Sequence, residues 1–246
     1  MIRAELLKLR LQRTPQVMAA LAAVIVAVVV GITVGKDLTA AEFADRANNA
    51  VYIFLPLVAA VLGGFVMGSE YRQDTLKRLA AVGPRRSRLL ATKVTVLLGS
   101  ILAASVVLLG LSAGAMAVLA SNAGTSFPTG TLWPMFASGT LAAVTVGLIA
   151  FGLSLVTRSD SFAMIGVLAL PLVLDPVVGA LASGVEKFTY SGAISGVTAP
   201  FEKVLGTTGD PGPSNVFGPA MAAAVLLAWV AVPVVAGTRK FLNADI

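Results

Sequence analysis

The chain has 246 residues, of which 57% are hydrophobic and only 12% are charged. A typical soluble domain carries about 25% charged residues, so this composition excludes an ordinary water-facing surface. The sequence has no Cys and no His, which removes thiolate chemistry, disulfides, Cys/His zinc sites and histidine acid–base catalysis. The net charge of +6 comes from bases that lie between apolar runs, a placement typical of membrane edges and not of nucleic-acid binding.

The apolar residues form runs of the length that a helix needs to cross a hydrocarbon core about 30 Å thick. A β-barrel would instead show alternating polarity over segments of about ten residues. The sequence therefore predicts an all-α polytopic membrane protein, with residues 1–246 as a single transmembrane domain of six helices. The predicted spans cover residues 17–34, 51–68, 94–120, 132–156, 161–182 and 216–235.

Residues 1–14 have Ile2, Leu6 and Leu9 at helical spacing, with bases around the remainder. This amphipathic pattern predicts an interfacial helix. A secretory signal peptide would have an apolar region of about 7 to 15 residues, and the run that follows Pro15 is longer. Residues 36–49 are polar, with more acid than base, and are predicted to form a short loop.

No charged residue lies between Val94 and Thr157, so the chain must turn back within this stretch. Breakers at residues 121–130 place the turn there. Two glycine pairs, Gly64 with Gly68 and Gly110 with Gly114, have the spacing that lets helices approach closely. The tryptophans, Trp133 and Trp229, are expected to lie at membrane interfaces.

The fifth apolar run contains Pro171 and then Asp175-Pro176, and it is predicted to bend or stop near Leu174. Asp175 is the only acid well inside an apolar run. An intramembrane carboxylate is a candidate for the transport pathway, but its place beside Pro176 equally fits a helix end at the outer interface. Residues 183–215, a mixed outer segment, form the longest stretch outside the spans.

The bases also predict the orientation of the chain. Four precede the first span, seven follow the second, and Arg158, Arg239 and Lys240 complete fourteen of the eighteen Lys and Arg. Positively charged loops stay on the cytoplasmic side. Both termini are therefore predicted to be cytoplasmic.

The segment between the second and third spans is the most charged in the chain. Tyr71, Leu76 and Leu79 can share one helical face, before Gly83-Pro84 breaks the helix ahead of a basic turn. A short helix along the membrane, connected directly to two spans, suits contact with a partner. The alternative is a basic loop that only fixes topology.

With these features the chain resembles the membrane subunits of type-2 ABC exporters. In those permeases a coupling helix between the second and third spans carries an acid, a Thr, an apolar stretch, a Pro and a basic residue. Matching residues occur here in the same order at Glu70, Thr75, Leu79, Pro84, Arg88 and Lys93. The resemblance implies a coupling helix over residues 70–90, re-entrant helices on the outer side between spans five and six, and a place in the cell membrane. The ATPase-coupling residues that it implies are Glu70, Arg72, Thr75, Leu76, Leu79, Pro84 and Arg88.

The resemblance also implies a dimer of permeases bound to two ATPase subunits. The sequence has no GxxxxGK[ST] phosphate loop, so ATP and Mg²⁺ are expected on the separate ATPase, with no cofactor on this chain. A pathway lined by Ala, Val, Leu, Ser and Thr suits export of a hydrophobic or amphipathic molecule: a drug in multidrug efflux, a lipid-like compound or a peptide.

Two other functions are compatible with a polytopic membrane chain. A membrane-embedded enzyme would need intramembrane catalytic groups, of which only Asp175 is available. A scaffold or small channel would not require the ordered basic helix between the second and third spans. A neighbouring gene for an ABC ATPase would favour the transport subunit over both.

Overall fold

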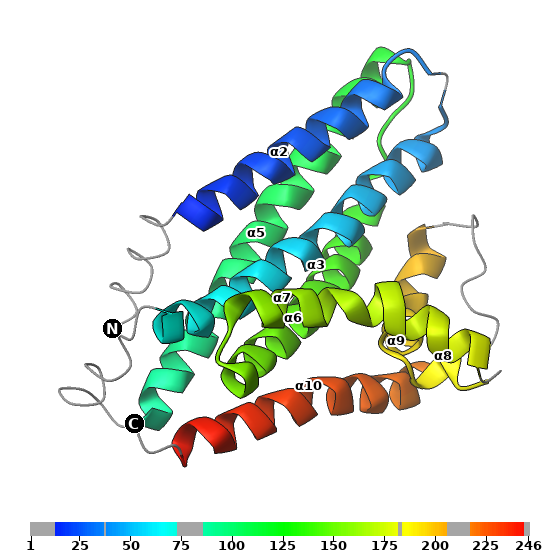
Figure 1. Ribbon diagram of the computed structural model, residues 1–246. Helices are drawn as coiled ribbons and strands as arrows, with labels where there is room; N and C mark the ends of the chain where they lie inside the picture. Colours follow the sequence, from blue (N-terminus) through cyan, green and yellow to red (C-terminus); the bar gives the residue numbers. More distant parts are fainter. Residues whose placement is uncertain (1–12, 37, 73–85, 182–183, 206–216, 244–246) are drawn as a thin grey trace.

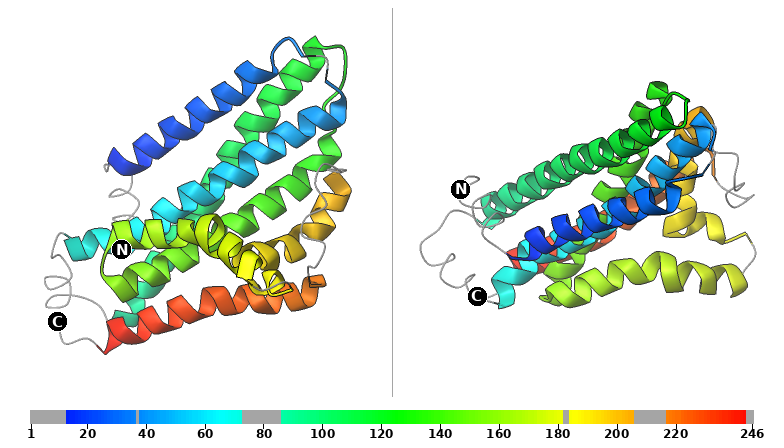
Figure 2. Two further views of the ribbon diagram at one scale, coloured as in Figure 1. Left: turned by 45° about the vertical axis from the view of Figure 1, so that its right-hand side comes forward. Right: turned by 90° about the horizontal axis from the view of Figure 1, so that it is seen from above.

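The fold is a bundle of long helices, and successive helices connect at its two ends (Figures 1 and 2). The computed structural model describes residues 13–36, 38–72, 86–181, 184–205 and 217–243, and no strand occurs among them. The α-helices are α2 (Arg13–Thr33), α3 (Ala40–Arg72), α5 (Arg86–Asn122), α6 (Leu132–Thr157), α7 (Asp160–Ala169), α8 (Asp175–Leu181), α9 (Tyr190–Leu205) and α10 (Pro219–Leu242). Three shorter elements are the 3₁₀-helix η1 (Thr129–Thr131), the π-helix η2 (Leu170–Leu174) and the 3₁₀-helix η3 (Glu186–Phe188).

Five helical segments are long and apolar enough to cross a membrane: Ala40–Arg72, Arg86–Asn122, Thr129–Thr157, Asp160–Leu181 and Pro219–Leu242. They contain the second to fifth predicted spans almost entirely, and most of the sixth. Helix α2 coincides with the predicted first span, and the total of six crossings stays a prediction. The predicted interfacial helix falls mostly on residues 1–12, outside the described residues.

Small residues let α3 and α10 pack closely on the central helix α6. A β-carbon on Gly63 of α3 would overlap the carbonyl oxygen of Gly147 on α6, and one on Gly152 of α6 would overlap the backbone of α10 at Pro233. In a membrane, helices associate through such close packing because lipid provides no hydrophobic drive between them. Glycine at these crossings therefore fixes the positions of α3, α6 and α10.

The predicted loop over residues 36–49 is wrong for most of its length, because α3 already begins at Ala40. Thr39 and Glu42 form a capping box. The Glu42 carboxylate accepts hydrogen bonds from the Thr39 backbone N–H at 2.7 Å, and the Thr39 hydroxyl accepts one from the Glu42 N–H at 3.3 Å. These bonds satisfy the free N–H groups of the first turn, so a polar sequence starts a helix here.

The bend predicted in the fifth span is confirmed. The helix passes from α7 into the π-helix η2, which contains Pro171, and continues as α8 from Asp175. Proline has no N–H to donate and clashes with the preceding turn, so a π-turn at this point is the expected response. Part of the outer segment, residues 190–205, forms α9, and residues 206–216 lie outside the described residues.

Candidate functional site

Charged side chains gather where four segments of the chain meet at one end of the bundle. We call this region the charged end and define it by residues 66–72, 86–93, 156–160 and 239–242. Figure 1 shows the C-terminal turns of α3 and α10, the first turns of α5 and the start of α7 at this same end. The segment that carries the predicted coupling helix, residues 73–85, joins α3 to α5 and lies outside the described residues.

A buried ion pair ties the end of α3 to the beginning of α5. Lys93 Nζ lies 3.0 Å from Glu70 Oε1, and the two side chains are only 1% and 2% exposed. The same ammonium donates a hydrogen bond to the carbonyl oxygen of Val66 at 3.1 Å. Removing one partner of a buried pair typically costs about 3–5 kcal/mol, because the other charge is left unpaired. The two helix ends beside residues 73–85 are thus held at a fixed distance.

A second ion pair ties the end of α3 to the start of α7. Arg72 Nη1 lies 2.7 Å from Asp160 Oδ2, with side chains 57% and 9% exposed. Solvent screens such a half-exposed pair, which contributes on the order of 0–1 kcal/mol. The close packing of α3 on α7 nevertheless fixes the position of Asp160 beside α3, since a β-carbon on Gly68 would overlap the Asp160 backbone.

The turn between α6 and α7 places Asp160 at this contact. Arg158 adopts a left-handed conformation with φ of 58° and ends α6, and the Ser159 hydroxyl accepts a hydrogen bond from the Phe162 N–H at 3.3 Å to cap α7. Asp160 then lies in the first helical turn, where an acid interacts favourably with the helix dipole. The Arg158 guanidinium lies 6.0 Å from the Tyr71 ring centroid, a further contact with α3.

Helix α10 joins the charged end through backbone carbonyls. Arg86 Nη1 donates to the Leu242 carbonyl oxygen at 3.1 Å, and Lys240 Nζ donates to the Val156 carbonyl oxygen at 2.7 Å. The last carbonyls of a helix have no partner within the helix, and basic side chains commonly satisfy them. The charged end therefore links α3, α5, α6, α7 and α10.

Of the predicted coupling residues, the structure brings Glu70 and Arg72 into this network, with Lys93 as the partner of Glu70. Arg88 is exposed in the first turns of α5. The others, Thr75, Leu76, Leu79 and Pro84, lie outside the described residues.

Sequence reasoning missed Asp160 as a site residue. A Ser followed directly by an acid at the start of an apolar run was the available signal of a capped helix start. That signal places Asp160 at a helix terminus, but only the fold shows that Arg72 is its partner.

Asp175 lies away from the charged end and holds α8 and α9 together. Its Oδ2 accepts a hydrogen bond from the Ser191 backbone N–H at 2.9 Å, in the first turn of α9. The other oxygen, Oδ1, is buried with no hydrogen-bond partner among the described residues. An acid at a helix N-terminus satisfies a free N–H and interacts with the helix dipole, so this carboxylate acts at least as a cap.

Five membrane-capable helices in an all-helical fold define a multi-pass membrane protein. The sequence model of the family described as "ABC-2 family transporter protein" matches residues 1–178. The chain therefore belongs to the ABC-2 transporter family, and the predicted kinship with type-2 ABC permeases is confirmed. A comparison with curated proteins gives no match to this chain.

The family match indicates an ABC transport permease, and it implies association with an ABC ATPase. The matched residues include α2 to α7, and with them the α3, α5 and α7 segments of the charged end.

Proposed function

We propose that this chain is the permease subunit of an ATP-driven exporter and that the charged end receives the motion of the ATPase. The observation that carries the proposal is the position of two ion pairs directly beside residues 73–85. Glu70–Lys93 joins α3 to α5, and Arg72–Asp160 joins α3 to α7. A force applied to the connecting segment would therefore act on three membrane helices together.

In this proposal residues 70–90 contain the coupling helix. Its ATPase-coupling residues include Thr75, Leu76, Leu79 and Pro84, and Arg88 is an exposed basic contact. ATP and Mg²⁺ are bound by the partner, in two copies. The charged end and both termini are cytoplasmic, in the cell membrane. The excess of bases at this end supports that orientation.

A second copy of the chain completes the transporter as a homodimer. Helix α5 supports this, because Val106, Val107 and Val118 are exposed. In addition, no atom of the described residues lies within 4 Å of a β-carbon built on Gly110 or Gly114. Between the two copies, the cargo is a hydrophobic or amphipathic molecule, with drugs, lipid-like compounds and peptides as the classes to assay.

Co-purification of this chain with an ABC ATPase from the same organism tests the partner surface. Arg88→Glu should lower the amount of ATPase retained, because it reverses an exposed charge next to the coupling segment. Lys36→Glu is the matched control, since Lys36 is equally exposed but lies in the loop between α2 and α3 at the other end of the bundle. Equal ATPase retention by both variants and the wild type would contradict the assignment of Arg88.

A further inference from the structure

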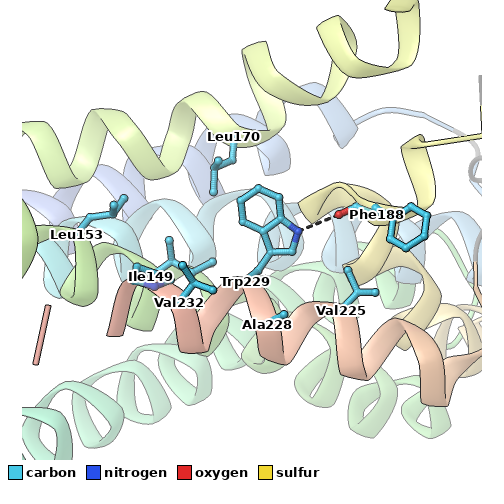
Figure 3. Close-up of a pocket in the computed structure, with 9 residues that line it drawn as sticks. Ile149, Leu153, Leu170, Phe188, Val225, Ala228, Trp229 and Val232 are labelled. Carbon is cyan, nitrogen blue, oxygen red and sulfur yellow. Dashed lines mark hydrogen bonds between the residues drawn. The ribbon is translucent and has the colours of Figure 1, made fainter. Parts of the chain in front are cut away.

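An apolar groove of about 570 Å³ lies between α6, η2 and α10, away from the charged end. Figure 3 shows Leu170 of η2 on one wall, Val225, Trp229 and Val232 of α10 on the opposite wall, and Phe188 at one end. The volume is in the range of about 300–1,000 Å³ that small-molecule sites occupy.

The groove opens beside surfaces that a membrane protein turns to lipid. Leu172 and Val173 of η2 are 75% and 60% exposed, and Val232 of α10 is 69% exposed. Pro171 lies in the π-turn η2 between α7 and α8, and Leu170, the first residue of that turn, forms part of the groove wall. The groove therefore opens toward the hydrocarbon chains of the bilayer.

A positive charge lies beside the end of the groove that Phe188 forms. Trp229 Nε1 donates a hydrogen bond to the Phe188 carbonyl oxygen at 2.9 Å (Figure 3). The neighbouring ammonium, Lys187 Nζ, lies 5.9 Å from the Phe188 ring centroid and 5.1 Å from that of Phe217. Aromatic faces hold this charge at the end of an apolar channel.

Within the described part of the chain, Lys187 has no carboxylate partner. The adjacent Glu186 packs against α8 instead, where its Oε1 would lie 3.3 Å from a β-carbon built on Gly179. The Lys187 ammonium is therefore available to an external anion.

We propose that the groove holds one acyl chain of an anionic phospholipid from the surrounding bilayer, with its phosphate at Lys187. The apolar walls of the groove suit a hydrocarbon acyl chain. The Lys187 ammonium, which lies beside two aromatic rings, has the charge opposite to that of the phosphate. Basic residues at a membrane surface select anionic lipids in the same way. The proposal requires only that the protein lies in a membrane, and it is independent of ATPase coupling and cargo.

Fluorescence quenching by brominated lipids tests this directly, because the chain has two Trp. In a Trp133→Phe background, Trp229 is the reporter. The full chain is placed in nanodiscs of phosphatidylcholine and phosphatidylglycerol at one fixed ratio, with brominated acyl chains on one lipid or the other. Brominated phosphatidylglycerol should quench Trp229 more strongly than brominated phosphatidylcholine.

Lys187→Gln should lower the preference for phosphatidylglycerol about fivefold, the effect of roughly one interfacial charge. Lys36→Gln, an exposed lysine outside the groove, should leave the preference unchanged. Ala228→Phe, which fills the groove from α10, should reduce quenching by both lipids.

Three results would overturn the proposal. Equal quenching by the two lipids would mean that no headgroup is selected. If Lys187→Gln keeps the wild-type preference for phosphatidylglycerol, Lys187 does not bind the phosphate. If neither lipid quenches Trp229, acyl chains do not enter the groove.

Discussion

Glu70 and Lys93 are the two residues on which the charged end depends most, because their charges are buried against each other. Glu70→Gln removes the carboxylate that lies 3.0 Å from the Lys93 ammonium, and we expect a loss of about 3–5 kcal/mol in the free energy of unfolding. The double variant Glu70→Lys with Lys93→Glu restores opposite charges and should recover part of that loss. Equilibrium unfolding in mixed detergent measures the free energy of unfolding of the single and the double variant. A double variant no more stable than Glu70→Gln would show that the pair is not the source of the stability.

Gly68 tests the contact between α3 and α7. A β-carbon at Gly68 would overlap the Asp160 backbone, so Gly68→Ala must separate the two helices or strain them, at about 1–3 kcal/mol. Gly99→Ala is the control, since a β-carbon there meets no atom of the described part of the chain within 4 Å and alanine is the better helix former. Thermal unfolding that is equally affected by the two substitutions would contradict the close packing of α3 on Asp160.

Glu70 and Arg72 were predicted for this site through the resemblance to type-2 ABC permeases, in which an acid opens the coupling motif, and their coupling role stays a prediction. Asp160 did not stand out, since a short Arg-Ser-Asp turn reads as an ordinary connection. Its partner Arg72 is distant in sequence, and only the packing of α7 on Gly68 brings the two together.

At the scale of whole elements, the start of α3 depends on its capping box. Thr39→Ala removes the hydroxyl that accepts from the Glu42 N–H and should cost about 1 kcal/mol. Hydrogen exchange at the first turn of α3 should rise while exchange at residues 55–65 stays unchanged. Unaltered exchange at residues 40–43 would mean that other contacts hold this helix start.

The same box explains why the loop prediction over residues 36–49 was wrong. The polar residues there predict a solvent-facing loop, although Thr39 and Glu42 have the spacing of a helix start. The bend at Pro171, in contrast, was predictable because proline acts through its own backbone wherever it stands.

Asp175 is also best tested through the elements that it joins. An asparagine at this position keeps an oxygen acceptor for the Ser191 N–H, whereas alanine does not. We expect Asp175→Asn to transport like the wild type and Asp175→Ala to lose about 1 kcal/mol of stability. A transport defect in Asp175→Asn without a loss of stability would instead favour a carboxylate in the pathway.

For the whole molecule, the distribution of charge predicts which end faces the cytoplasm. The natural chain has no cysteine, so single cysteines report on topology without interference. Arg88→Cys should be protected from a membrane-impermeant maleimide in intact cells, and Lys36→Cys should be labelled. The reverse pattern would invert the proposed orientation.

The proposed function requires that the charged end transmit work from an ATPase to the membrane helices. The most direct measurement is ATP hydrolysis by the partner ATPase, alone and assembled with this chain in nanodiscs. We predict that the wild-type chain stimulates hydrolysis, that Arg72→Ala reduces the stimulation while the complex stays assembled, and that Lys36→Ala does not. Hydrolysis that is the same with and without the chain, in an assembled complex, would contradict the account.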